Sequence, residues 1–285
     1  MRSLLFVPAD RPERFAKAAS SGADVLILDL EDSVVPDRKP LGREEVVSYL
    51  RTALPRPKLF VRVNPLGSPY ITSDLAALRG TQPDGIVLPK AEGAASVMAL
   101  TELLGSSGIE APILPIVTET PRAMFQLGSY ADATASLVGL TWGAEDLPAA
   151  MGAVTNREPD GRYTPPYELA RSLTLFAAHA AGIDAVETVY PDFKDLAGLS
   201  TYVARAARDG FTGMMAIHPS QIAIINAGFT PSDDAIAHAQ QIIDAFAVHP
   251  GAGALQINGR MVDAPHLKQA LKLLARVKPQ NIPSS

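Results

Sequence analysis

The 285-residue sequence contains no cysteine. Disulfide bonds, thiolate metal sites and cysteine nucleophiles are therefore excluded, because each of them needs a thiol. Histidine is also scarce, and its five copies are scattered at positions 179, 218, 238, 249 and 266. Since this scatter has no ligand spacing, it does not argue for zinc. For His218, which precedes a proline, we expect a structural role between a strand and a loop.

Basic residues and long apolar runs are also few. The 25 Lys and Arg against 30 Asp and Glu give a net charge of −5, whereas nucleic acids and anionic membranes require a basic surface. No run reaches the roughly 18 apolar residues of a membrane-spanning helix. The initial RSLLFVPAD lacks the h-region of a signal peptide. We therefore expect a cytoplasmic protein whose partners include neither nucleic acid nor membrane.

The sequence does contain eight short apolar runs, followed in most cases by a segment of helical periodicity. The runs cover residues 3–9, 25–30, 58–63, 85–90, 113–119, 136–143, 185–190 and 213–219. They are near-continuous rather than alternating, which is typical of parallel strands buried on both faces. The pattern predicts an α/β fold, a (β/α)8 TIM barrel. An open doubly wound sheet is less favoured, because VPADRPERF follows the first run instead of a G-x-G-x-x-G turn.

The chain continues beyond the last strand and helix that a barrel needs. The expected barrel helices cover residues 12–22, 41–54 (stopped by Pro55), 91–108, 165–182, 196–210 and 220–228. A further helix at 231–249, a hairpin marked by Asn258-Gly259 within 251–263, and a final helix at 265–278 follow. We therefore predict a barrel domain at residues 1–229 and a C-terminal helical and hairpin extension at residues 230–285. A long polar insertion occupies residues 154–165.

Polar and charged side chains collect where the predicted strands end. Since the active sites of (β/α)8 barrels lie at this end of the strands, the pattern predicts a polar cavity with excess negative charge. The residues concerned are Asp29, Glu31, Asp32, Arg62, Asn64, Lys90, Glu119, Glu145, Asp146, Glu187 and His218. Unpaired charge is costly away from water, so such carboxylates must face solvent, a cation or a substrate. Mg²⁺ suits this set, because it binds oxygen ligands and needs only one or two protein carboxylates.

Each candidate also has an ordinary structural interpretation. Arg62 lies inside an apolar run and could bind a substrate carboxylate through its guanidinium fork, or form a buried ion pair with a strand-end acid. The WGAED turn (142–146) offers backbone amides to an anion, but Asp146 could equally be a helix N-cap. Glu119 could be a first-turn acid favoured by the helix dipole. Taken together, at the ends of adjacent strands, Glu119 and Asp146 form a candidate metal pair.

Eight sequence blocks then occur in an order that is highly specific for one family. They are RSLLFVPADRPERFAKA, GADVLILDLEDSV, FVRVNP, GIVLPKAE, ETPRAM, GAEDL, AIHPSQI and GRMVDAP. With these blocks the sequence resembles the citrate lyase β-subunit-like group of the HpcH/HpaI aldolase superfamily, which includes malyl-CoA and citramalyl-CoA lyases. The resemblance covers about residues 2–275, nearly the whole chain, and implies a (β/α)8 barrel enzyme that depends on Mg²⁺.

The resemblance also implies roles for individual residues. Glu119 and Asp146 would take the positions of the two metal-binding carboxylates. Arg62 would be the arginine that stabilises the enolate oxygen and binds substrate. The backbone amides around Gly143, Ala144 and Glu145 would hold the carboxylate of an α-keto acid.

Family members that act on CoA thioesters carry a C-terminal lid, and residues 230–285 would be that lid. Asp263, in the block GRMVD, matches an acid that a neighbouring subunit's lid contributes to the active site. Asp263 is therefore the candidate for proton transfer. A lid that needs a neighbour implies a homo-oligomer, a trimer or hexamer by the family pattern.

The implied reaction is a carbon–carbon lyase reaction of the aldolase type. A 3-hydroxyacyl-CoA thioester such as malyl-CoA or citramalyl-CoA would be cleaved to an acyl-CoA and an α-keto acid, or formed in reverse. Two alternatives stay open. One is a malyl-CoA thioesterase or malate synthase-type activity, and the other is a citryl-carrier-protein lyase β subunit that works only in a complex.

The sequence departs from the family pattern at three places. Met214 and Met215 stand where family members often carry lysine, Glu187 stands where aspartate is usual, and the insertion at 154–165 is longer than expected. Each departure could change the contacts to the acyl group or CoA, so substrate identity is not carried over.

If Glu119 and Asp146 bind the metal, the three carboxylates at the end of the second apolar run, Asp29, Glu31 and Asp32, must have other roles. Glu31 and Asp32 become candidates for holding metal-bound waters or orienting Arg62. Asp32 is kept among the candidate catalytic residues, together with Arg62 and Asp263. Asp29 lies one step earlier in the strand, and we expect it to be structural.

Overall fold

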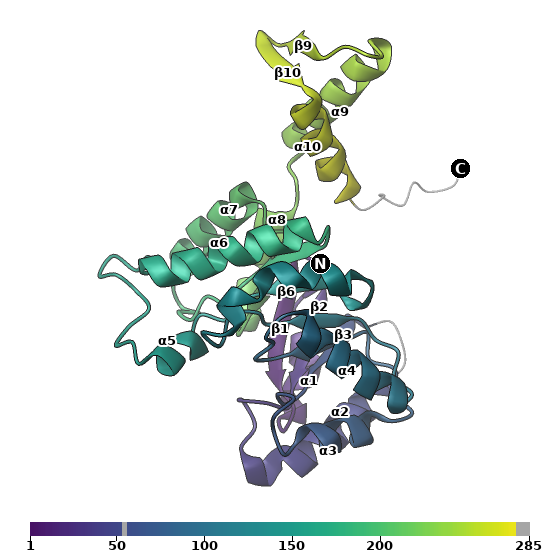
Figure 1. Ribbon diagram of the computed structural model, residues 1–285, viewed down its shortest axis with the longest axis vertical. Coiled ribbons are helices and arrows are strands. Elements are labelled where there is room, and N and C mark those ends of the chain that lie inside the picture. The colour runs from purple at the N-terminus through teal and green to yellow at the C-terminus, as the bar shows by residue number, and fades with distance from the viewer. Residues whose placement is uncertain (53–55, 278–285) are drawn as a thin grey trace. The chain divides into compact units, whose positions relative to one another are not determined.

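Eight parallel β-strands form the centre of the larger part of the molecule (Figure 1). The computed structural model describes residues 1–52 and 56–277. The strands are β1 (Ser3–Pro8), β2 (Val25–Asp29), β3 (Lys58–Arg62), β4 (Gly85–Leu88), β5 (Ile113–Pro115), β6 (Gly139–Thr141), β7 (Asp184–Glu187) and β8 (Gly213–Ala216). Each predicted apolar run overlaps one of these strands, and only β7 begins outside its run, by one residue, so the predicted α/β (β/α)8 barrel is confirmed.

The strands close into a nearly complete barrel. They are hydrogen-bonded in the order β5-β4-β3-β2-β1-β8-β7-β6. Isolated parallel bridges, Ile113 with Leu137 and Ile116 with Thr141, join the two ends of this order. Apolar side chains fill the interior, namely those of Leu4, Val25, Ile27, Phe60, Val87, Leu114, Ile116, Val186 and Met215. Intervening strand residues such as Leu26 and Leu28 are also buried, which explains the near-continuous apolar runs.

Helices connect the strands along the chain. The α-helices up to residue 229 are α1 (Phe15–Ala19), α2 (Lys39–Leu50), α3 (Ile71–Leu78), α4 (Ala94–Ser106), α5 (Asp146–Met151), α6 (Pro165–Ala180), α7 (Leu196–Asp209) and α8 (Ile222–Phe229). Short 3₁₀ helices accompany them: η1 (Pro12–Arg14), η2 (Pro36–Arg38), η3 (Ala123–Phe125), η4 (Leu127–Ser136) and η5 (Pro219–Gln221). Pro36 and Pro219 begin their 3₁₀ helices, as expected of a residue whose missing N–H is not needed there.

The structure corrects several predicted helices. The helix expected at 12–22 is a 3₁₀ turn followed by five α-helical residues. The helix expected at 41–54 ends at Leu50, and Pro55, expected to stop it, lies outside the described residues. Helix α3 was not predicted. The segment after β5 forms 3₁₀ turns, in keeping with the low helix propensity of Gly128 and Ser129.

The described residues divide into two compact units, the second beginning at Gly228. It contains α9 (Asp233–Val248), β9 (Ala254–Ile257), β10 (Arg260–Asp263) and α10 (Ala264–Ala275). Asn258 and Gly259 both adopt positive φ angles, 48° and 78°, as a two-residue hairpin turn requires. Ala239, Ile242, Val262 and Ala270 form a small apolar core. The last residue of the helix predicted at 265–278 lies outside the described residues.

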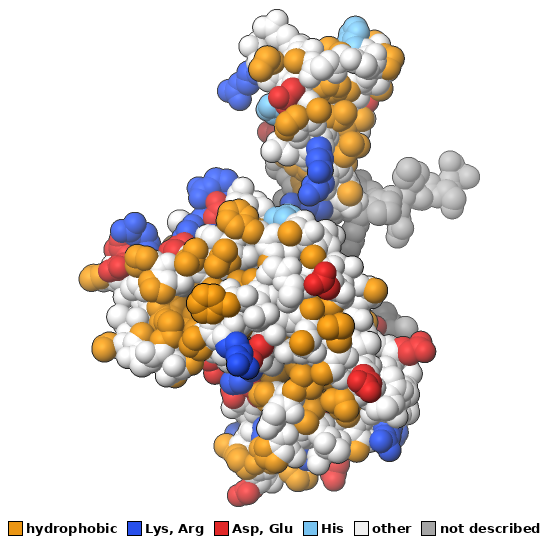
Figure 2. All heavy atoms as spheres, in the orientation of Figure 1, with side chains coloured by type: hydrophobic (Ala, Val, Ile, Leu, Met, Phe, Trp, Pro, Cys, Tyr) orange, Lys and Arg blue, Asp and Glu red, His pale blue; other side chains and the backbone are white. Residues whose placement is uncertain are grey.

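The surface charge and the helix lengths can be compared with the expectation that nucleic acid and membrane are not partners. Figure 2 shows acidic and basic side chains interspersed over the visible face of the barrel unit. Within residues 1–52 and 56–277, no helix is both long and apolar enough to cross a membrane.

Candidate functional site

The predicted site residues of the barrel line one cavity of about 450 Å³. The shared feature of these residues is their place at or just beyond the carboxyl end of β2, β3, β5 or β6. They are Asp32, Arg62, Glu119, Gly143, Ala144, Glu145 and Asp146. Asp263 belongs to the second unit, at the end of β10, so its assignment stays a prediction.

Arg62 is fixed by two acids from the end of β2. Its Nε and Nη2 atoms donate to the two carboxylate oxygens of Asp29, each at 2.7 Å, and its Nη1 lies 2.9 Å from Glu31 Oε2. Burial by itself would raise the pKa of Asp29, but the Arg62 charge and hydrogen bonds outweigh burial and hold this pKa below its ordinary value. Arg62 is thus in a buried ion pair, and its guanidinium still borders the cavity.

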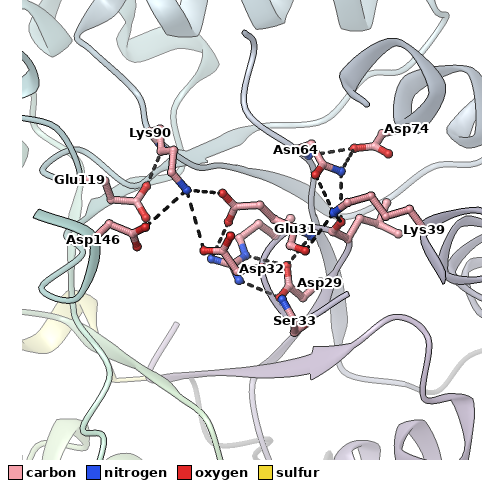
Figure 3. A network of polar contacts seen from close by, with 12 residues as sticks. Asp29, Glu31, Asp32, Ser33, Lys39, Asn64, Asp74, Lys90, Glu119 and Asp146 are labelled. Atoms are coloured by element: carbon pink, nitrogen blue, oxygen red, sulfur yellow. Dashed lines mark hydrogen bonds and ion pairs between the residues drawn. The ribbon is translucent and has the colours of Figure 1, made fainter. Parts of the chain in front are cut away.

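A second polar network lies beside this pair and joins β2, β3 and two helices (Figure 3). The buried Lys39 ammonium donates to the carbonyl oxygens of Leu30 and Glu31 and to Asn64 Oδ1. Asp74 Oδ2 in turn accepts hydrogen bonds from the backbone N–H and the side-chain amide of Asn64. These bonds hold the ends of β2 and β3 in a fixed position relative to each other.

Glu119 is buried, with 3 % of its surface exposed. Burial raises the pKa of its carboxyl to about 8, and the nearby carboxylates of Glu31 and Asp146 act in the same direction. The Lys90 backbone N–H donates to Glu119 Oε2. Gly143 provides the space for this side chain, because a Cβ at position 143 would lie 2.8 Å from Glu119 Cγ. Glu119 is therefore a carboxylate whose ionised form would gain from a nearby cation.

Lys90 is a central residue of the site, and from the sequence it was placed at a strand end but given no role. Its backbone has a φ of 51°, an uncommon value for a residue with a side chain. Its ammonium lies 2.6 Å from Glu31, 3.5 Å from Asp146 and 3.8 Å from Asp32 (Figure 3). Lys90 thus links the acid cluster after β2 to the predicted metal pair. Its place at the end of an apolar run was the available signal, but nothing in the spacing showed which acids it meets.

The turn after β6 is held in place by Thr118. The Gly143 N–H donates to Thr118 Oγ1 at 3.1 Å, and this hydroxyl donates to the Gly143 carbonyl oxygen at 3.0 Å. Within the described residues, the N–H groups of Ala144 and Glu145 have no hydrogen-bond acceptor. Asp146 is the first residue of α5, and the N-cap is Glu145 without a side-chain capping bond. The N-cap interpretation of Asp146 is therefore wrong.

The donor set fits Mg²⁺. Within the part of the chain that the structure describes, no group of three or more His, Asp or Glu side chains forms a complete set of metal ligands. Mg²⁺ does not need one, because it keeps several waters and accepts one or two carboxylates. Glu119 and Asp146 both border the cavity, and both lie near the Lys90 ammonium. Their negative charge thus already attracts one cationic group, that of Lys90.

Glu187 and His218 have structural positions. The Glu187 side chain is fully buried, pairs with Arg171 Nε at 2.7 Å and accepts a hydrogen bond from Trp142. His218 caps η5 by accepting from the Ser220 N–H, in agreement with the structural role expected for it. Of the two methionines that replace the expected lysine, Met215 lines the cavity.

The chain is similar in sequence to known proteins over nearly its whole length. Residues 2–219 match the family model described as HpcH/HpaI aldolase/citrate lyase. A citrate lyase subunit beta-like protein of Mycobacterium tuberculosis is 40% identical over 272 residues, covering 95% of this chain and 94% of its own length. An L-malyl-CoA/beta-methylmalyl-CoA lyase of Cereibacter sphaeroides is 34% identical over 292 residues, covering 94% and 92%.

A solved structure is similar over the same extent. It is the protein CitE from Mycobacterium tuberculosis in complex with magnesium, acetoacetate and coenzyme A. The TM-score is 0.80 with 39% sequence identity, and the match covers 96% of this chain and 97% of that chain.

Proposed function

The chain belongs to the HpcH/HpaI aldolase/citrate lyase family, and from this premise we propose that it is a Mg²⁺-dependent carbon–carbon lyase. Its substrate is a 3-hydroxyacyl-CoA thioester such as malyl-CoA or citramalyl-CoA, which it cleaves to an acyl-CoA and an α-keto acid, or forms in reverse. The observation that carries this proposal is the convergence of Arg62, Glu119 and the turn at 143–146 on one cavity. The magnesium and coenzyme A bound to the related CitE structure support the cofactor and the thioester.

Glu119 and Asp146 are the residues that would hold the metal ion. Mg²⁺ supplies a Lewis acid that polarises the oxygen on the carbon where the bond breaks. Burial raises the pKa of the Glu119 carboxyl to about 8, so the ionised form of this side chain is disfavoured unless a positive charge lies nearby. A divalent cation between these two carboxylates would provide that positive charge.

Arg62 would stabilise the negative charge that develops during cleavage. The substrate hydroxyl gives its proton to a base and becomes the keto group, the bond to the α-carbon of the thioester breaks, and the electron pair of that bond forms the acyl-CoA enolate. The enolate carbon then takes up one proton, so that no proton is gained or lost overall. Asp29 and Glu31 already hold the guanidinium in position, so no reorganisation is needed when the charge appears. A fixed charge of this kind can contribute ~3 kcal/mol to the transition state.

The apolar part of the cavity lining favours keto acids that carry a single carboxylate. Oxaloacetate presents a second carboxylate beside its keto carbon, whereas glyoxylate or pyruvate presents a hydrogen or a methyl group. Apolar side chains of the same lining, Ile116, Val189 and Met215, suit such a group. This argument favours malyl-CoA and citramalyl-CoA over a citryl thioester.

The segment 230–285 would act as a lid over the site of a neighbouring subunit in a homo-oligomer. Asp263 would then transfer the proton to or from the enolate carbon. A hydrogen bond with His266 holds the pKa of Asp263 below its ordinary value, so this carboxylate is ionised at neutral pH, as a base must be.

The proposal is tested by incubating the purified chain with malyl-CoA, citramalyl-CoA and citryl-CoA, with Mg²⁺ or with a chelator. We expect keto acid and acyl-CoA in equal amounts from the first two substrates, with the product lost on chelation. Release of free CoA without keto acid would contradict the lyase and identify a thioesterase. No reaction with any CoA thioester would contradict an enzyme that acts alone.

A further inference from the structure

The polar insertion after α5 is attached to the turn that carries the candidate carboxylate-binding amides. The side-chain amide of Asn156 donates to the carbonyl oxygen of Ala144 at 2.8 Å. The same nitrogen also makes a long and weak hydrogen bond of 3.5 Å to the Glu145 carboxylate. Among the described residues, every hydrogen bond between 154–164 and the turn at 143–146 comes from this one side chain.

The insertion is itself a folded structure, so the backbone that carries Asn156 is held in place. The Thr164 N–H donates to the Asn156 carbonyl oxygen at 2.9 Å, which closes the loop. The Arg157 guanidinium lies 4.0 Å from the centre of the Tyr163 ring and donates to the Tyr163 hydroxyl at 2.8 Å. The Tyr163 ring in turn packs edge-on against Trp142, at 5.1 Å between ring centres, directly before the turn.

The hydrogen bond from Asn156 to the Ala144 carbonyl also fixes the direction of the next backbone N–H, that of Glu145. The peptide bond is planar and trans, so the C=O and N–H of one peptide group point in opposite directions. Asn156 holds the Ala144 carbonyl and thereby sets the direction of the Glu145 N–H. Thr118 holds the Gly143 carbonyl at 3.0 Å and sets the direction of the Ala144 N–H in the same way. Both N–H groups have no acceptor among the described residues.

We propose that Asn156 is a positioning residue that aims the Glu145 N–H at the carboxylate of the α-keto acid. The assignment rests on the proposed function, in which the amides of this turn bind that carboxylate. A carboxamide suits the role, because its NH₂ group donates to a carbonyl. An aspartate of the same shape would instead place an oxygen against the Ala144 carbonyl and displace the peptide.

The experiment compares Asn156→Asp and Asn156→Ala with the wild type. Pyruvate binding to the Mg²⁺-loaded protein is measured by calorimetry, and the KM values for pyruvate and acetyl-CoA are measured in the condensation direction. We expect a loss of pyruvate affinity of roughly tenfold or more, the range for a hydrogen bond to a charged group, with the larger loss in Asn156→Asp. The KM for acetyl-CoA and the Mg²⁺ affinity should not change.

Arg162→Gln is the matched control in the same loop. The Arg162 side chain is 75% exposed and pairs with Asp160 rather than with the turn, so this variant should bind pyruvate like the wild type. Equal losses of pyruvate, acetyl-CoA and Mg²⁺ affinity in the Asn156 variants would overturn the positioning role, because they would show a general collapse of the site. Unchanged pyruvate affinity would also overturn it. Failure of the wild type to bind pyruvate would instead overturn the proposed function, and this assignment with it.

Discussion

At the scale of single residues, the site depends on charges held close together without full compensation. Glu119 shows this most clearly, because burial and two neighbouring carboxylates raise its pKa to about 8 from an ordinary value of 4.5. A carboxyl whose folded pKa lies above its unfolded pKa stabilises the fold below the unfolded value. This contribution is lost as the pH rises through the folded value. Without metal, the stability that Glu119 allows should therefore fall as the pH rises from 4.5 to about 8, and it should stay low above that pH.

Glu119→Gln tests this cost directly. The glutamine keeps an oxygen for the Lys90 N–H and removes the charge. Without Mg²⁺ at pH 9, we expect the variant to be more stable than the wild type by on the order of a few kcal/mol in urea denaturation, with a smaller difference at pH 6. With Mg²⁺, the variant should lose the metal-induced rise in stability and its lyase activity. A wild type that is equally stable at pH 6 and pH 9 would argue against the buried charge.

Gly143→Ala tests the space that Glu119 occupies. The added Cβ would lie 2.8 Å from Glu119 Cγ and 3.2 Å from Ile116 Cγ2, so the glutamate must move. We expect Mg²⁺ affinity, measured by calorimetry, to fall by roughly tenfold or more, since a displaced ligand loses at least one strong bond. Gly128→Ala is the control, because a Cβ there meets nothing within 4 Å. Similar Mg²⁺ affinity in both variants would show that position 143 does not shape the metal site.

At the scale of secondary-structure elements, α3 has a role beyond covering the barrel. It places the fully buried Asp74 against Asn64 at the end of β3, and Asp74 also accepts a hydrogen bond from Arg43 of α2 at 2.8 Å. One carboxylate thus joins two helices to a strand that carries Arg62. A short amphipathic helix would not need such a residue on its buried face.

Asp74→Ala should therefore be strongly destabilising. Removing the acid leaves the Arg43 guanidinium and the Asn64 amide without their buried acceptor, which typically costs about 3 kcal/mol. Urea denaturation should show this loss, and the surface variant Glu102→Ala on α4 should unfold like the wild type. If the two variants have the same midpoint, the network around Asn64 does not support the fold.

The elements also show what the sequence could and could not reveal. The strands were predictable, because burial on both faces makes each run apolar over its whole length. Helix α3 was missed because it is short and carries Asp74 on its buried face, where periodicity expects an apolar residue. The positions of Arg62, Glu119 and Asp146 at strand ends pointed to one cavity. Lys39 and Lys90 could not be assigned in this way, since their partners come from distant segments that meet only in the folded chain.

At the scale of the whole molecule, the second unit raises the question of how Asp263 reaches a substrate. If the lid of one subunit covers the site of another, as proposed, a mixture of two inactive variants should recover activity. We expect Glu119→Gln and Asp263→Asn to be nearly inactive alone. After dissociation and reassembly together, some sites would combine an intact barrel with an intact lid.

This recovery is measured as lyase activity of the reassembled mixture relative to each variant treated alone. A matched mixture of Glu119→Gln with Asp146→Asn, which both alter the barrel, should stay inactive. No recovery in the first mixture would mean that the lid acid serves its own subunit or has no part in the reaction.

The arrangement of β5 and β6 has a consequence for the motion of the barrel. These strands have three residues each, and the contacts between them include isolated bridges rather than a continuous ladder. Glu119 and Asp146 extend from this same seam. A cation held by both carboxylates would link β5 and β6 where the hydrogen-bond ladder between strands is interrupted. Metal binding should therefore reduce local opening of this part of the barrel. Amide hydrogen exchange at Val117, whose N–H donates to Thr141 across the seam, should then slow when the ion binds.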